Sequence, residues 1–77
     1  MPTALRIDGF RFFFYSKEGN EPTHIHVAQQ DNAAKFWLSP VSLVWNEGFN
    51  TGSLTRLHRL VRANRTLLWE KWNEHFS

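Results

Sequence analysis

The segment Ala4-Leu5-Arg6-Ile7-Asp8-Gly9-Phe10-Arg11-Phe12-Phe13-Phe14-Tyr15 decides the fold class of this chain. It contains two short β-like runs, residues 4–7 and 10–15, separated by Asp8-Gly9. This dipeptide readily takes the two positive-φ positions of a type I′ turn, which connects antiparallel strands tightly. The segment therefore predicts a β-hairpin.

Downstream of the hairpin, the same reasoning predicts more strands. Residues 16–23 form a polar stretch with turn-forming residues and no large apolar residue, so we expect a loop. Residues 24–28 and 33–38 have β character on either side of a turn at 29–32, which predicts a second hairpin. After Pro40, apolar residues at 41, 43 and 45 alternate with their neighbours and favour a fifth strand over 41–46.

After Phe49 the apolar period changes from two to that of a helix with one buried face. The recurring positions are Leu54, Leu57, Val61, Leu68, Trp72 and Phe76. Asn50 is a good N-cap, and Phe49 before it would meet Leu54 as a hydrophobic staple, so we expect the helix to begin near Thr51. Asn64 falls inside the apolar stripe of a continuous helix, which favours a break near Ala63-Asn64.

These elements predict an α+β fold: an antiparallel sheet of four or five strands packed against one long or broken C-terminal helix. With 77 residues we expect one domain, 1–77, with a β-rich part at 1–46 and a helical part at 50–77. The absence of cysteine excludes a disulfide framework, a zinc ribbon and a thiol nucleophile.

Composition restricts the function classes further. The net charge is +2, too small to indicate nucleic-acid binding by bulk charge. We expect a cytoplasmic protein, because neither a signal-peptide pattern nor about 18 consecutive apolar residues occur. Seven Phe, four Trp and one Tyr are more aromatic surface than a core of this size hides easily, so we expect some rings to be exposed or covered by a partner.

The most unusual motif is His24-Ile25-His26 on a predicted strand. Strand alternation places both histidines on one face, about 6 to 7 Å apart. If the apolar residues of the other face contact the helix, an outer face with cationic and aromatic side chains results. The members of this candidate binding surface are Arg11, Phe13, Tyr15, His24, His26, Lys35 and Trp37.

Several interpretations of this face remain open. His24 and His26 could supply two zinc ligands, with a third from Glu74 or His75, although two ligands alone do not make a site. They could instead share acid–base cleavage of RNA, with Arg11 or Lys35 stabilising the phosphorane charge. A third interpretation is single-strand binding on exposed rings. The simplest is structural: half-exposed imidazoles stacked on aromatic rings, with a second small core under the 16–23 loop.

The helical part offers a second candidate surface for a partner. Arg56, Arg59 and Arg62 lie on its polar arc, where such rows are most often solvated faces but can also dock an acidic partner. Trp69 lies at the edge of the apolar stripe, as either an interface anchor or a partly buried boundary residue.

Several segments in order carry a resemblance to a known family. They are Met1-Pro2-Thr3, Gly9-Phe10-Arg11-Phe12-Phe13-Phe14-Tyr15-Ser16, His24-Ile25-His26-Val27, Ala34-Lys35-Phe36-Trp37-Leu38, and Asn64-Arg65 followed by Trp72-Asn73-Glu74. Together they resemble the bacterial family called domain of unknown function 4160, over essentially the whole chain. Family members often have Pro-Pro before the first histidine, where this chain has Pro22-Thr23.

The resemblance implies a compact cytoplasmic protein without an established activity, commonly encoded beside another small protein. We therefore expect a protein-interaction component of a small bacterial two-gene module, of the toxin–antitoxin kind, whose partner is a small protein encoded nearby or a second copy of the chain. The alternatives are a histidine-dependent RNA-cleaving enzyme and a single-stranded nucleic-acid-binding module. We expect no cofactor.

Overall fold

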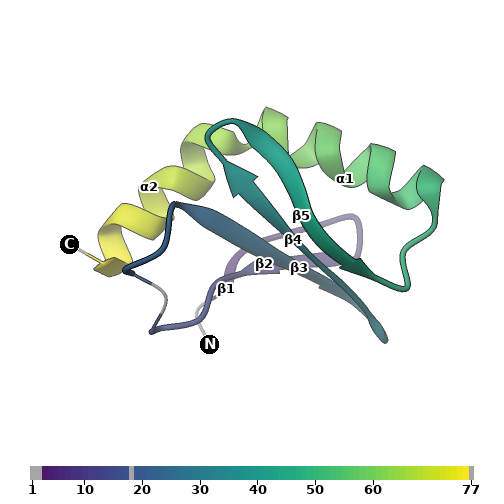
Figure 1. Cartoon of the computed structure of the whole chain (residues 1–77), viewed down its shortest axis with the longest axis horizontal. Coiled ribbons are helices and arrows are strands. Elements are labelled where there is room, and N and C mark those ends of the chain that lie inside the picture. The colour runs from purple at the N-terminus through teal and green to yellow at the C-terminus, as the bar shows by residue number, and fades with distance from the viewer. Residues whose placement is uncertain (1–2, 18, 77) are drawn as a thin grey trace.

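The computed structural model describes residues 3–17 and 19–76 (Figure 1). Met1 and Pro2, which belong to the family resemblance, and Glu18 of the expected loop lie outside these residues. Over the described residues, five strands precede two helices. The elements are β1 (Thr3–Ile7), β2 (Phe10–Phe13), β3 (His24–Gln29), β4 (Asn32–Leu38), β5 (Val41–Glu47), α1 (Thr51–Ala63) and α2 (Arg65–Phe76).

All strand pairs are antiparallel, and the order in the sheet is the order in the chain, β1-β2-β3-β4-β5. The β1–β2 turn has Asp8 at φ 52° and Gly9 at φ 83°, the left-handed backbone that a type I′ turn requires. Both predicted hairpins are present, and the fifth strand is formed. β1 and β5 are the two edges of the sheet.

Strand β2 is shorter than the predicted run 10–15. It ends at Phe13, because Phe14 leaves the sheet ladder and packs against α2. The Phe14 ring lies 5.6 Å from both the Trp72 and the Phe76 rings. Contact with a helix more than fifty residues later in the chain therefore overrides the local β preference.

Strand β5 does not keep the strict alternation that its sequence suggests. Leu43 pairs with Phe36, but Trp45 pairs with Lys35, so Val44 is the extra residue of a β-bulge. Leu43 therefore lies on the helix side of the sheet and Trp45 on the opposite side. The expectation that Leu43 and Trp45 share a face is wrong.

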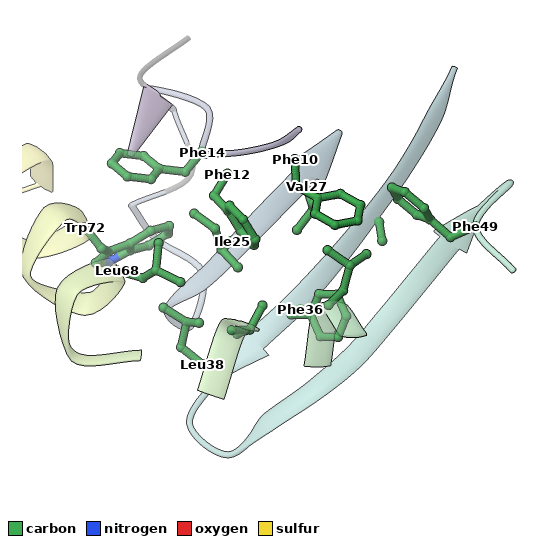
Figure 2. Close-up of a cluster of buried hydrophobic side chains, with 13 residues drawn as sticks. Phe10, Phe12, Phe14, Ile25, Val27, Phe36, Leu38, Phe49, Leu68 and Trp72 are labelled. Carbon is green, nitrogen blue, oxygen red and sulfur yellow. The ribbon is translucent and has the colours of Figure 1, made fainter. Parts of the chain in front are cut away.

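The helices cover one face of the sheet and enclose the main core (Figures 1 and 2). In Figure 2, Phe14 and Trp72 lie at one end of this core and Phe49 at the other. Helix α1 contributes Leu57 and Val61 to the main core, and α2 contributes Leu68 and Trp72. Burying each large apolar side chain contributes about 1.5–3 kcal/mol, so this face dominates stability.

The helical part is broken where the sequence predicts. Asn50 caps α1 by accepting a hydrogen bond from the Ser53 N–H at 2.8 Å. α1 ends at Ala63, and the Asn64 side chain donates to the Leu60 carbonyl at 2.8 Å. Arg65 begins α2 and donates through Nε to the carbonyl of Leu38, so both polar side chains at the break are hydrogen-bonded.

Candidate functional site

The two histidines of β3 lie on the face of the sheet opposite the main core, because Ile25 and Val27 between and after them fill that core. They are not surface residues. His24 is 0% exposed and His26 6% exposed, and their ring centroids lie 5.2 Å apart in a T-shaped arrangement. The expectation of half-exposed imidazoles is therefore wrong.

His26 is enclosed by aromatic rings. Its ring stacks on Phe13 at 5.4 Å and meets Tyr15 edge-on at 4.8 Å. Trp45 approaches from β5, with 6.0 Å between ring centroids. The bulge at Val44 supplies this third ring, which the alternation in the sequence did not predict.

His24 is closed off from solvent by two tryptophans. Trp37, its partner on β4, lies 5.8 Å away, and Trp72 of α2 lies 4.8 Å away between ring centroids. His24 Nδ1 lies 2.9 Å from the Pro22 carbonyl oxygen. Because a carbonyl only accepts, Nδ1 carries the hydrogen, and this bond fixes both the tautomer and the ring orientation.

The neighbouring cations lie over aromatic rings and do not converge on the imidazoles. The Arg11 guanidinium lies 4.4 Å from the centre of the Phe13 ring, and Lys35 Nζ lies 4.8 Å from that of Trp37. Lys35 also forms an ion pair of 2.9 Å with Glu21. Both cations therefore cover the edge of the cluster.

The strand register brings the candidate binding surface together on one face, with Tyr15 joining just after β2 ends. We call its aromatic part the histidine cluster: His24, His26, Phe13, Tyr15, Trp37 and Trp45. Phe13 is 5% exposed, so it cannot stack on a base, whereas Tyr15 is 45% exposed and Trp45 39% exposed. The cluster is thus a second small core with two exposed rings at its rim.

This burial limits the chemistry available to the histidines. General acid–base catalysis requires an imidazole within about 2.6–3.2 Å of the reacting group. A substrate phosphate reaches His24 only if Trp37 or Trp72 moves away. The arrangement thus favours a structural role for His24 over RNA cleavage.

A metal site does not assemble around the pair either. Among residues 3–17 and 19–76, no three His, Asp or Glu side chains lie close enough to hold a metal ion. His75, one of the expected third ligands, lies against the Phe14 ring at 5.2 Å and the Phe76 ring at 4.8 Å.

The predicted basic row of α1 splits into two parts. Arg56 reaches back to the first hairpin and forms a 2.6 Å ion pair with Asp8. Arg59 and Arg62 instead line a groove between α1 and the sheet. Trp69 is 39% exposed, and the Arg65 guanidinium lies 5.1 Å from the centre of its ring.

We call this depression the β5 groove, a space of about 420 Å³. Its lining residues are Phe36, Leu43, Thr51, Leu54, Thr55, His58, Arg59 and Arg62. Apolar side chains from both the sheet and the helix meet there, beside two arginines. Sequence reasoning missed the groove and His58, because they arise from the packing of α1 across β4 and β5.

Strand β5, which supplies Leu43 to the groove, is also an edge strand of the sheet. Three consecutive large apolar residues on it are exposed: Leu43 at 43%, Val44 at 37% and Trp45 at 39%. Edge strands of soluble proteins are normally protected by charges, prolines or a covering segment. An exposed apolar edge of this kind is a candidate interaction surface.

A family model described as a domain of unknown function, DUF4160, matches residues 9–73. The chain belongs to this family. All the segments that carry the resemblance fall inside the match except Met1-Pro2-Thr3 and Glu74. No curated protein and no solved structure matches this DUF4160 chain.

The family motifs have clear structural places in this DUF4160 chain. Residues 9–16 contain Gly9 of the turn, strand β2 and the three residues after it, residues 24–27 form most of β3, and residues 34–38 form most of β4. Asn64-Arg65 forms the break between the helices, and Trp72 closes over His24. Neither α1 nor α2 has the length and apolar character needed to cross a membrane.

Proposed function

We propose that this DUF4160 chain is a protein-interaction component whose partner adds a strand to the open edge of β5. One observation carries the proposal: three consecutive large apolar side chains are exposed on an edge strand. In β-strand addition, main-chain hydrogen bonds give affinity, and side chains at alternate positions give specificity.

The two edges of the sheet differ in ways that favour β5. β1 carries the exposed, charged Arg6 near its centre, which disfavours pairing with another chain. Between Val41 and Asn46, β5 has no charged side chain, and Glu47 comes only at its end. The bulge at Val44 limits the register in which a partner strand pairs, which makes a specific partner more plausible than unrestricted self-association.

The proposed partner is a small protein encoded nearby, in a bacterial two-gene module of the toxin–antitoxin kind that acts in the cytoplasm. This part of the proposal comes from the family resemblance. A second copy of the chain is the other candidate occupant of the edge. The RNA-cleaving and single-strand-binding alternatives have less support, because Phe13, His24 and His26 are buried.

Purification of the chain with and without its gene neighbour, followed by light scattering, tests the proposal. We expect a complex that Val44→Lys weakens at least tenfold, because the new charge must lose water at the paired edge. Leu67→Lys is the matched control: Leu67 is a similarly exposed apolar residue, 39% exposed, on α2. Its complex should be unchanged.

Two results would count against the proposal. If the chain is monomeric alone and never co-migrates with its neighbour, it has neither candidate partner. If Val44→Lys and Leu67→Lys weaken the complex equally, the interface does not depend on the β5 edge.

A further inference from the structure

A second depression lies where the β4–β5 turn meets the break between the helices. Its lining residues are Ser39, Pro40, Val41, His58, Arg62 and Arg65, and it encloses about 630 Å³. It shares His58 and Arg62 with the β5 groove, so the two depressions adjoin. The lining includes two arginines and no carboxylate.

Arg65 is held in a fixed position at this depression. Nε donates to the Leu38 carbonyl, and Nη2 lies 3.2 Å from Ser39 Oγ. The guanidinium also lies over the Trp69 ring. A guanidinium has five N–H groups, so most of them remain available to a ligand. The folded protein already holds this guanidinium in one orientation.

The carbonyl oxygens of Val41 in the wall and of Leu38, just before the wall residues in the chain, each have a donor from the protein nearby, which weakens their repulsion of an anion. Leu38 O accepts from Arg65. Val41 O lies 3.3 Å from His58 Nε2, which must donate because a carbonyl only accepts. The charged side chains of the wall, Arg62 and Arg65, are both hydrogen-bond donors.

Arg62 supplies the second cation. It is exposed on the last turn of α1, one helical turn after His58, and it lines the same depression as Arg65 at the start of α2. Among the described residues, Lys35, Arg56 and Lys71 form ion pairs with carboxylates, and Arg62 forms none. Its charge is therefore available to a ligand.

We propose that this depression, the arginine pocket, binds a dianionic phosphate group, either the free ion or a terminal monoester. Two guanidinium groups and the Ser39 hydroxyl reach it from different elements, which suits a tetrahedral anion better than a flat carboxylate. A monoester carries a charge of about −1.5 to −2 at pH 7, matching the two arginines. Phosphate binding here does not require a partner at the β5 edge, although the pocket adjoins the β5 groove through His58 and Arg62.

Isothermal titration calorimetry with two probes tests the site and separates the sources of the phosphate. Inorganic phosphate tests the free ion. A single-stranded tetranucleotide with a 5′-phosphate, compared with its 5′-hydroxyl form, tests a nucleic-acid end. We expect one of these phosphates to bind, and Arg62→Gln to weaken its binding about tenfold.

Arg6→Gln is the control, since it removes the same charge from an exposed arginine on β1. Arg65→Lys is a second probe: it keeps the charge but loses the fork, so we expect at least a fivefold loss of binding with the fold retained by circular dichroism. Binding of neither phosphate, or equal losses with Arg62→Gln and Arg6→Gln, would overturn the proposal.

Discussion

Residue by residue, the histidine cluster shows how a polar side chain becomes part of a core. His24 is fully enclosed, with Nδ1 hydrogen-bonded to Pro22 O and the ring in contact with Trp37 and Trp72. A buried polar group with such partners specifies one arrangement of its neighbours. His24 therefore ties the loop before β3 to the end of α2.

This role predicts a stability effect at His24. His24→Ala removes one buried hydrogen bond and leaves a cavity between Trp37 and Trp72, so the free energy of unfolding should fall by about 2–4 kcal/mol. Urea denaturation measures it. His75→Ala is the control, since His75 is exposed although its ring borders Phe14, and the expected loss is below about 1 kcal/mol. Equal losses for the two variants would contradict the structural role.

Among the elements, the joint between β5 and α1 depends on a glycine. Gly48 has φ 93°, a left-handed backbone that glycine adopts without strain. A Cβ at this position would also collide with the side-chain amide of Asn32 at the start of β4. The joint therefore depends on glycine for two separate reasons, backbone strain and steric contact.

Gly48→Ala should lower the free energy of unfolding by about 1–3 kcal/mol, from the strained φ and the collision together. Thermal denaturation followed by circular dichroism measures the loss. In an Asn32→Ala background the collision is absent, so the same substitution should cost less. An equal cost in both backgrounds would assign the whole effect to the backbone.

Across the whole molecule, the sheet buries aromatic side chains on both faces. The main core lies under the helices, and the histidine cluster lies on the other face. Trp72 connects the two, because it contacts Phe14 in the main core and His24 in the cluster. This arrangement accommodates most of the aromatic surface, and the exposed remainder lies mainly on β5, Tyr15 and α2.

Trp72→Ala should therefore destabilise the entire fold, by about 3–5 kcal/mol, a large part of the roughly 5–15 kcal/mol typical of a domain. The melting temperature should fall steeply and near-ultraviolet circular dichroism should weaken. Trp69→Ala, on the same helix but 39% exposed, should cost about 1 kcal/mol or less. A small effect at Trp72 would show that α2 packs less tightly than its contacts indicate.

Features that depend on neighbours in the chain can be predicted from the amino-acid sequence. The Asp8-Gly9 turn, the Asn50 cap and the break at Asn64 follow from turn chemistry and helix periodicity, which act over a few residues. Tertiary structure alone decided which surfaces are open. Burial of His24 requires Trp72, forty-eight positions later in the chain, and the bulge at Val44 moves Trp45 to the histidine face. The β5 groove and the arginine pocket likewise form only where distant elements pack, because no local pattern encodes the space between a helix and a sheet.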